Sequence, residues 1–209
     1  MFYKSKVNDL NNMNIVKNHS ALTNTEEMFM GCTDLFGRFY IYEDDENITD
    51  LNFFEGCTGL SDASGMFAGC ISLGEANSKA QRTQGAKNLE LNIAIPVHFF
   101  RDCVNLSQVD SMFSHCYNLT GKIGVGSEAL GGGLFATNTA LSNCSQMFAN
   151  CYLLTGAIPE DIFYNSSNTA YTSLTNISGM FFGCSYLATK LGTSVLGFNK
   201  ENIYNTPAQ

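Results

Sequence analysis

The sequence predicts an α/β repeat, a stack of short strands and short helical turns around a spine of phenylalanine, cysteine and leucine side chains. Three observations support this prediction. The phrase Phe-x-x-Cys-x-x-Leu recurs along most of the 209 residues, seven of the eight cysteines occupy the same place in it, and the copies come in pairs. An apolar triplet that recurs in this way is typical of stacked units that bury their triplets against one another.

Seven copies of the phrase define the predicted spine. They are Phe29, Cys32 and Leu35; Phe54, Cys57 and Leu60; Phe67, Cys70 and Leu73; Phe100, Cys103 and Leu106; Phe113, Cys116 and Leu119; Phe148, Cys151 and Leu154; and Phe181, Cys184 and Leu187. Residues at positions i, i+3 and i+6 share one face of about two turns of a short α-helix or 3₁₀ segment. We therefore expect each copy to form a short helical turn with its triplet pointing inward.

The copies are arranged in pairs. In five of them a Leu-Ser or Leu-Thr step lies four residues before Met-Phe, and this leucine closes an upstream copy. The two phenylalanines of a pair lie thirteen residues apart in Phe54/Phe67, Phe100/Phe113 and Phe135/Phe148. Degenerate first members fit the same register, namely Phe135-Asn138-Leu141, Val16-His19-Leu22 and, with extra residues before Leu174, Phe163. Because His19 occupies a cysteine position, we interpret it as a variant of the core.

Local signals place a few elements within this pattern. Residues 89–95 alternate large apolar residues with smaller or polar ones and predict a strand that ends at Pro96. Thr23 has capping-box spacing to Glu26, and Pro159 precedes two acidic residues, so both positions predict helix starts. Short strand, turn and short helix, repeated, is the expected unit.

The pattern also divides the chain. We expect an N-terminal segment with a degenerate capping repeat at 1–21, a repeat array at 22–190 and a C-terminal tail or cap at 191–209. The spacing between pairs varies from 33 to 46 residues, and such insertions form loops on one rim of a repeat stack. The expected loop insertions lie near 36–50, 74–88 and 120–134.

Three stretches carry a resemblance to a known family. LSDASGMFAGCISL, LTNISGMFFGCSYL and LLTGAIPEDIFYN resemble the BspA-like leucine-rich-repeat family of bacterial surface proteins, with its recurring Met-Phe-x-x-Cys-x-x-Leu phrase. The resemblance covers roughly Leu22 to Leu187. It implies a leucine-rich-repeat-like solenoid that serves as a non-enzymatic binding or adhesion module, at a cell surface or secreted, with a protein or carbohydrate ligand on a host or neighbouring cell. The sequence departs from the family in its irregular pair spacing and in the absence of a visible secretion signal.

The net charge and the apolar content limit the classes of partner that the chain can bind. A net charge of −8 argues against nucleic acid and against an anionic membrane surface, because both need clustered Lys and Arg. No apolar run approaches the roughly 20 residues of a membrane span, so no membrane insertion is expected. The polar start of the chain predicts no signal peptide. The chain is therefore interpreted as a fragment or mature form of a longer secreted protein, as a component of a phage virion, or as an intracellular protein.

The position of each cysteine in the repeat predicts its chemical state. Cysteines at equivalent positions of stacked units pack as small buried thiols, whereas Cys144 lies off register and is the candidate for a disulfide with Cys151 or Cys116. His115 beside Cys116 raises the alternatives of a metal site or a Cys-His nucleophile. The register predicts a buried, unreactive Cys116. We accordingly expect no enzyme activity and no cofactor.

Two further sets of side chains are candidate sites. The acidic run that contains Asp44 and Asp45, with Asp50 after it, offers oxygen ligands to Ca²⁺, but it lacks EF-hand spacing and is better interpreted as a solvated loop. Tyr117, Tyr152 and Tyr186 follow the motif cysteine by one or two residues. Facing outward, they would form an aromatic stripe suited to carbohydrate or protein contacts. The equally weighted alternative is that these rings cover the seams between units.

The sequence thus leaves three functions, of which we favour the first. They are a non-enzymatic binding or adhesion module, a structural or host-binding virion protein of a phage, and a thiol enzyme that uses Cys116. The stacked spine also predicts that Phe113→Ala costs more stability than Phe181→Ala, since a unit at the end of an array has one neighbour.

Overall fold

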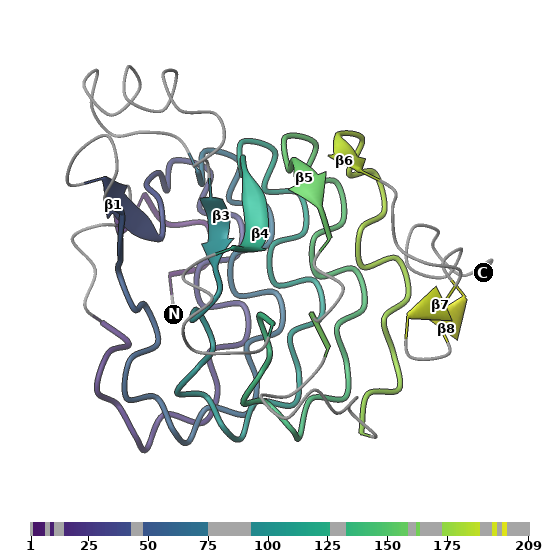
Figure 1. Cartoon of the computed structure of the whole chain (residues 1–209). Helices are drawn as coiled ribbons and strands as arrows, with labels where there is room; N and C mark the ends of the chain where they lie inside the picture. The colour runs from purple at the N-terminus through teal and green to yellow at the C-terminus, as the bar shows by residue number, and fades with distance from the viewer. Residues whose placement is uncertain are drawn as a thin grey trace.

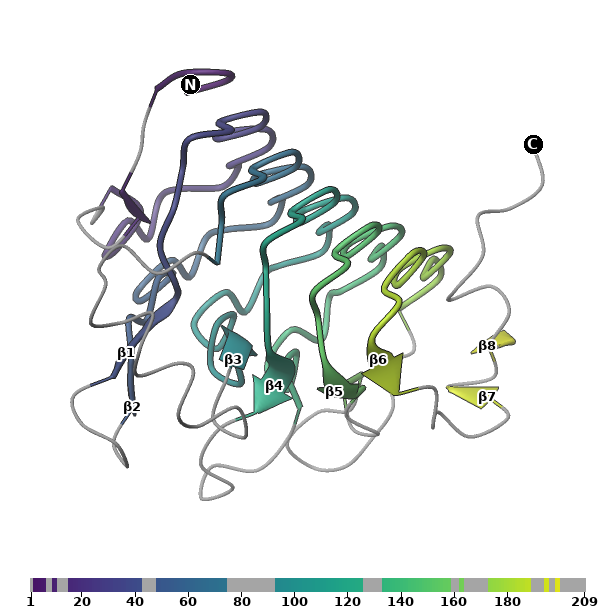
Figure 2. The same cartoon turned by 90° about the horizontal axis from the view of Figure 1, so that it is seen from above.

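The computed structural model describes residues 2–6, 9–10, 15–42, 48–74, 93–125, 133–158, 162–163, 173–188, 194–195 and 198–199. In these residues successive passes of the chain lie side by side from the N-terminal to the C-terminal end (Figures 1 and 2). We call each pass a coil. A coil runs along a first arm, turns at a corner, and returns along a second arm. Each arm contains one copy of the repeated phrase.

The corners are joined by parallel pairing of neighbouring coils. Successive bridges link Asn24, Asp62, Gln108, Asn143 and Asn176. The hydroxyl groups of the preceding residues strengthen this pairing, because each donates to a carbonyl oxygen of the coil before it at 3.0–3.2 Å. These bonds run from Ser61 to Thr23, from Ser107 to Ser61, from Ser142 to Ser107 and from Thr175 to Ser142. The recurring Leu-Ser or Leu-Thr step therefore supplies a ladder of hydroxyl groups.

Short strands form a second line of contact between coils. β3 (Ile93–Pro96) pairs in parallel with β4 (Lys122–Val125), and β5 (Gly156–Ala157) pairs in parallel with β6 (Leu187–Ala188). These four strands lie in a row along one side of the molecule (Figure 2). Two antiparallel pairs complete the described strands: β1 (Tyr40–Tyr42) with β2 (Ile48–Asp50), and β7 (Ser194–Val195) with β8 (Phe198–Asn199).

The strand predicted over residues 89–95 overlaps β3. Residues 93–95 belong to β3, which extends through Pro96, whereas residues 89–92 lie outside the described part of the chain. All four residues of β3 are buried, although the alternating pattern indicates a half-buried strand. Parallel pairing with β4 on one side and the phenylalanine core beneath it account for this burial.

Two columns of stacked phenylalanine rings fill the core. In the second arms, neighbouring ring centroids are 5.3–5.5 Å apart and the ring planes lie within 9° of parallel, through Phe2, Phe29, Phe67, Phe113, Phe148 and Phe181. In the first arms the centroids are 5.3–6.1 Å apart, through Phe54, Phe100, Phe135 and Phe163. The structure buries all twenty-one side chains of the spine given above. Offset stacking adds to the burial of large apolar surface, so these columns dominate the packing energy.

Phe2 belongs to the second-arm column, which the sequence analysis missed. Its backbone N–H donates to the carbonyl oxygen of Met28 at 2.8 Å, as that of Phe29 donates to Met66 at 2.8 Å. The signal was present in the sequence, since Met1 and Phe2 repeat the Met-Phe step and Ser5 takes the cysteine position. Ser5 Oγ lies 3.7 Å from Cys32 Sγ.

The cysteines form a ladder of thiols between coils. Each second-arm thiol donates to the carbonyl oxygen of the phenylalanine one coil earlier, at 2.9–3.1 Å. The pairs are Cys32 with Phe2, Cys70 with Phe29, Cys116 with Phe67, Cys151 with Phe113 and Cys184 with Phe148. A small side chain with one weak donor fits this position between stacked rings, which explains why cysteine recurs there.

Cys144 lies in a different column from the other cysteines. It is fully buried at the position four residues before Phe148, where the other coils have Thr25, Ala63, Val109 and Ile177. All eight cysteines are buried and free, so the structure contains no bond from Cys144 to Cys151 or Cys116. Cys144 is thus one more small apolar residue of the core.

The arms are chains of tight turns and not the short helices expected from the spacing. Cys32 N donates to Phe29 O and Leu35 N donates to Cys32 O, both at 3.0 Å, so bonds of the i to i+3 type recur every three residues. Left-handed residues interrupt any helix two positions after the phenylalanine, as at Gly69 with φ 72° and Asn150 with φ 61°. The predicted Thr23 cap is also absent, because Asn24 Oδ1 accepts from Glu26 N at 2.7 Å instead.

Gly69 provides a test of this left-handed position. A Cβ atom there would have Gly31 Cα as its nearest neighbour at 3.7 Å, an ordinary contact, so only the backbone conformation opposes a side chain. We expect Gly69→Ala to lower the free energy of unfolding by about 1–2 kcal/mol in urea titrations. Gly69→Asn is the matched control and should cost less, since Asn150 adopts the same conformation at the equivalent position two coils later. Equal losses for Ala and Asn would contradict this explanation.

Two degenerate positions behave differently from each other. His19 is exposed, so its interpretation as a core variant is wrong. The backbone carbonyl oxygen of Val16 accepts the hydrogen bond from the Cys57 thiol at 2.6 Å. His19 stays exposed because no earlier first arm among the described residues covers this one. Asn138 is fully buried, and its Nδ2 donates to the carbonyl oxygens of Phe100 at 3.1 Å and Cys103 at 2.7 Å.

Asn138 Oδ1 has no hydrogen-bond partner although it is buried. An unsatisfied buried acceptor costs about 1–3 kcal/mol, while the thiol found elsewhere in the ladder leaves no such atom. We expect Asn138→Cys to raise the free energy of unfolding by about 1 kcal/mol, measured by urea titration. Asn138→Ala, which removes the donor as well, should lower it. If Asn138→Cys is as unstable as Asn138→Ala, the unsatisfied Oδ1 atom does not limit stability.

Candidate binding surface on the second arms

The three candidate tyrosines all reach the surface of the second arms. The exposed fractions are 36% for Tyr117, 42% for Tyr152 and 66% for Tyr186. The rings of Tyr117 and Tyr152 stack with centroids 5.2 Å apart and planes 14° from parallel. This pair spans the junction between two neighbouring coils while more than a third of each residue stays exposed. The structure thus brings two of the three tyrosines together. Tyr186 lies two residues after its motif cysteine, whereas Tyr117 and Tyr152 lie one residue after theirs.

Other large apolar side chains are exposed at neighbouring register positions. Ile71 is 37% exposed, Leu153 40% and Phe182 37%. We call this set together with the three tyrosines the aromatic patch. Sequence analysis named only the tyrosines. The signal for the other three was their place in the repeat. Ile71 directly follows a motif cysteine, Leu153 comes two residues after one, and Phe182 directly follows a motif phenylalanine. The turns direct the side chains at these positions outward.

The positions directly after the motif cysteines, which carry most of the aromatic patch, are nearly free of charge. The first and second positions after the motif cysteine in the five second arms are Thr33 and Asp34, Ile71 and Ser72, Tyr117 and Asn118, Tyr152 and Leu153, and Ser185 and Tyr186. Asp34 is the single charged residue among these ten. Association there would therefore depend on apolar contact and hydrogen bonding, with little electrostatic steering.

His115 is fixed beside the patch by contacts to both ring nitrogens. Nδ1 lies 2.8 Å from Ser114 Oγ, and Nε2 lies 3.1 Å from Asn150 Nδ2. With the Asn150 amide in this orientation its nitrogen donates to Nε2, and this pairing corresponds to the tautomer in which Nδ1 donates to Ser114 Oγ. The imidazole ring also meets the Tyr117 ring edge-on, with centroids 5.9 Å apart. His115 is therefore part of the rigid border of the patch.

The Cys-His arrangement considered from the sequence is not formed. Cys116 Sγ is fully buried and donates to Phe67 O at 3.1 Å, while both nitrogens of His115 are engaged at the surface. Burial raises the pKa of the Cys116 thiol well above its ordinary value, and the neighbouring thiols of Cys151 and Cys70 add to the effect. Burial likewise raises the pKa of Cys70 and that of Cys184 to about 12. Thiolates are thus strongly disfavoured in the ladder.

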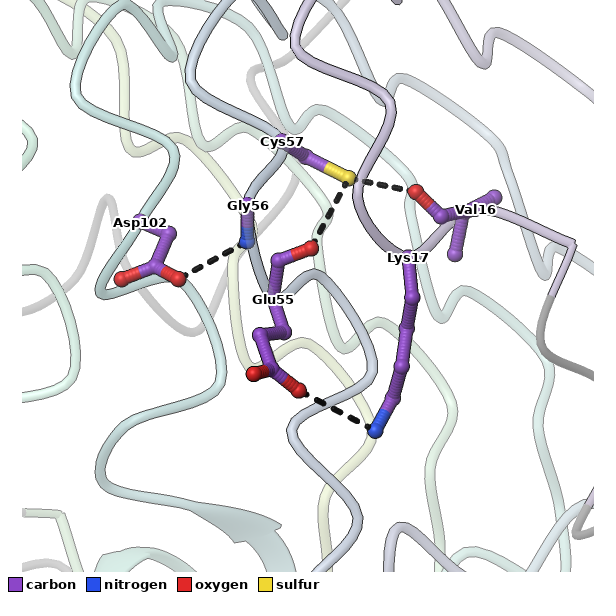
Figure 3. Close-up of polar contacts among 6 residues, drawn as sticks. All are labelled: Val16, Lys17, Glu55, Gly56, Cys57 and Asp102. Carbon is purple, nitrogen blue, oxygen red and sulfur yellow. Dashed lines mark hydrogen bonds and ion pairs between the residues drawn. The ribbon is translucent and has the colours of Figure 1, made fainter.

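The first arms present a different surface, in which charged groups are paired with one another. Lys17 Nζ lies 3.5 Å from Glu55 Oε2, and Asp102 Oδ2 accepts from the backbone N–H of Gly56 at 2.8 Å (Figure 3). Arg101 Nε lies 3.6 Å from Asp102 Oδ1. The contacts of Lys17 with Glu55 and of Gly56 with Asp102 cross from coil to coil, whereas Arg101 and Asp102 are neighbours in one coil. The first-arm face is therefore a weaker candidate for a binding surface than the aromatic patch.

The calcium candidates fall largely outside the described residues. Asp44 and Asp45 lie there, and Asp50 is described only as backbone at the end of β2. Among the residues with described side chains, no group of three or more His, Cys, Asp or Glu is placed to hold a metal ion. No helix in the described part of the chain has the length and apolar character needed to cross a membrane.

Comparison with known proteins leaves this surface without a precedent. No family model, no curated protein and no solved structure matches the sequence. The resemblance to the BspA-like leucine-rich-repeat family accordingly stays a prediction from the repeated phrases.

Proposed function

We propose that the chain is a leucine-rich-repeat-like solenoid of the BspA-like type, and that it serves as a non-enzymatic binding or adhesion module at a bacterial surface. Its proposed ligand is a protein on a host or neighbouring cell. The observation that supports this most is the aromatic patch, in which large side chains at neighbouring register positions are exposed and the positions after the motif cysteine carry little charge. Exposed aromatic clusters of this kind are the usual anchors of protein interfaces.

The ring arrangement favours a protein ligand over a carbohydrate. Tyr117 and Tyr152 each use one ring face for the other, so each has at most one face left to stack on a sugar ring. Tyrosine in this role supplies rigid contact area and a hydrogen bond at a low cost in conformational entropy. Only Tyr186, at 66% exposure, retains a largely open ring.

The proposal is tested by cell binding of the labelled chain. We expect saturable binding to a responsive line within a panel of cultured animal cells and bacteria, and a loss of at least about tenfold in affinity for the Tyr152→Ser/Tyr186→Ser double variant, because truncated anchors cost about 2 kcal/mol or more. Protease treatment of the cells should abolish binding, while periodate oxidation of their glycans should not.

The matched control is Glu55→Ser on the first arm, whose side chain is also exposed. This variant should bind within about twofold of the parent, since a rim charge outside the interface contributes little. Sensitivity to periodate alone would replace the protein ligand by a carbohydrate. Undiminished binding of the tyrosine double variant would remove the aromatic patch from the proposal.

A further inference from the structure

The N-terminal end of the stack carries a second surface, separate from the aromatic patch. Two observations meet there. The corner of the first coil lacks the backbone partners that every later corner has on this side, and an apolar hollow of about 580 Å³ opens beside it. The first corner edge, as we call residues 22–27, is the structural element concerned.

Interior corners are hydrogen-bonded on both sides. Ser107, for example, donates its N–H to Ser61 O at 2.9 Å, and the next coil's Ser142 N donates to Ser107 O at 2.9 Å. The first corner edge bonds only toward the second coil, where Thr23 O accepts from Ser61 N at 2.9 Å. On the other side, Thr23 N, Asn24 N and the carbonyl oxygens of Asn24 and Glu26 have no backbone partner among the described residues. This arrangement is an open backbone edge with two donors followed by two acceptors.

The hollow lies where a preceding coil would place its apolar side chains. Phe2, Ile15, Leu22 and Met28 provide its apolar lining, next to residues 18–21. Leu22 and Met28 are only half-buried, and Ile15 is 41% exposed. The residues that correspond to Leu22 and Met28 in the later coils are almost completely buried, namely Leu60 and Met66, Leu106 and Met112, Leu141 and Met147, and Leu174 and Met180. The exposed apolar surface is therefore specific to this end.

The chain itself shows how a segment docks on this end. Phe2 N donates to Met28 O at 2.8 Å and Lys4 N donates to Met30 O at 2.9 Å, while the Phe2 ring stacks on Phe29 at 5.3 Å. Residues 2–4 thereby add one further pass of the chain to the stack of second arms. They leave the first corner edge uncovered.

We propose that the first corner edge binds an extended segment of a separate protein as an added parallel strand, with a Leu or Ile side chain of that segment in the hollow. Parallel orientation follows from the corner pairing, which is parallel at every bridge between Asn24 and Asn176. Strand addition of this kind takes its affinity from main-chain hydrogen bonds and its specificity from the side chain that enters the pocket. The partner therefore needs an extended stretch that carries a branched apolar residue at the position facing the hollow.

A separate protein fits this edge better than a second copy of the chain. A second copy would offer the corner of its last coil, but Leu174, Ile177 and Met180 there are already buried, with at most 6% exposure. Those side chains cannot fill a hollow in a neighbouring molecule. The interior corners are engaged on both sides and have no edge to offer.

The experiment uses a synthetic peptide with the sequence of residues 174–179, which is acetylated, amidated and labelled with a fluorophore. Fluorescence anisotropy with the full chain should give saturable binding, and Thr23→Pro should weaken it at least about tenfold, because proline removes the N–H that the added strand needs. Thr23→Ala keeps this N–H and should bind within about twofold of the parent. Thr23 N makes no hydrogen bond within the described fold, so thermal melts should show that both variants remain folded.

Each remaining outcome decides against the proposal. Equal binding by Thr23→Pro and Thr23→Ala would show that the edge is not used, and the absence of saturation would show that it does not accept a strand. Sedimentation of the chain alone completes the test, since self-association abolished by Thr23→Pro would assign the edge to a second copy. The Tyr152→Ser/Tyr186→Ser variant should bind the peptide normally, which separates this result from the cell-binding test.

Discussion

Raising the pH from 8 to about 10 is expected to unfold the protein completely, with the loss of stability concentrated above pH 9. Seven of the eight thiols have a pKa that burial raises above the ordinary value, to about 12 for Cys70 and Cys184. The same thiols titrate near pH 8.5–9 in the unfolded chain. Above that pH the unfolded state releases protons that the folded state retains, so the free energy of unfolding falls.

The magnitude of this effect is large because the thiols act together. Each contributes a slope of about −1.4 kcal/mol per pH unit between its unfolded and its folded pKa. The six of these thiols other than Cys57 have the largest shifts and give a slope of about −8 kcal/mol per pH unit, which is comparable with the 5–15 kcal/mol total stability of a typical domain. Below the unfolded pKa the contribution is fully present, and stability should therefore be nearly independent of the thiols at pH 7.

Urea titrations at half-unit steps between pH 7 and pH 10 measure this slope directly. Cys144→Ala removes one buried thiol without breaking a described hydrogen bond, so its slope should be shallower by about one sixth. A slope that corresponds to one proton or none would show that the thiols are accessible to water in the folded state. Reducing agent should leave the profile unchanged, since the structure contains free thiols alone.

Phe113→Ala is expected to lower the free energy of unfolding by about 3–5 kcal/mol, the usual cost of truncating a buried phenylalanine. The Phe113 ring is fully buried between Phe67 and Phe148, each 5.5 Å away, and meets the edge of Phe39 at 5.9 Å. Truncation removes two stacked contacts and leaves a cavity that the rigid columns cannot close.

The expected contrast with Phe181→Ala changes in the light of the structure. The sequence pattern predicts a smaller loss at Phe181 because it belongs to the last copy, yet Phe181 is only 1% exposed. We therefore expect a loss of similar size there. Phe182→Ala is the control, since Phe182 is 37% exposed and should cost below about 1 kcal/mol. Small losses at both Phe113 and Phe181 in chemical denaturation would refute the stacked columns.

The register of the core was accessible from the sequence because apolar spacing is directly visible in the residues. Phe54, Phe100 and Phe135 could be aligned by their distance of thirteen residues to the next copy, and they stack as one column. The local backbone was not accessible, since the spacing i, i+3, i+6 fits successive tight turns as well as a helix. Gly31 and Gly69 before the motif cysteine were the signal for left-handed turns.

The candidate site was predictable only in part, for a related reason. Tyr117 and Tyr152 follow a buried cysteine, so their outward direction could be deduced once that cysteine was placed in the core. The exposure of Leu153 and Phe182 depends on where the left-handed residues turn the chain, which the spacing alone does not reveal. The prediction for His19 was wrong because register alone does not bury a side chain. His19 occupies a core position of the repeat, but no earlier described arm covers it.

The ladder of hydroxyl groups at the corners makes the coils interchangeable. Ser107 relates to Ser61 as Ser142 relates to Ser107, with the same donor, acceptor and distance of 3.0 Å. A gene that encodes such a chain can gain or lose a whole coil by duplication or deletion, and each new junction would reproduce contacts already present. The length of the outer face can thus change in steps of one coil, while the packing of the core stays the same.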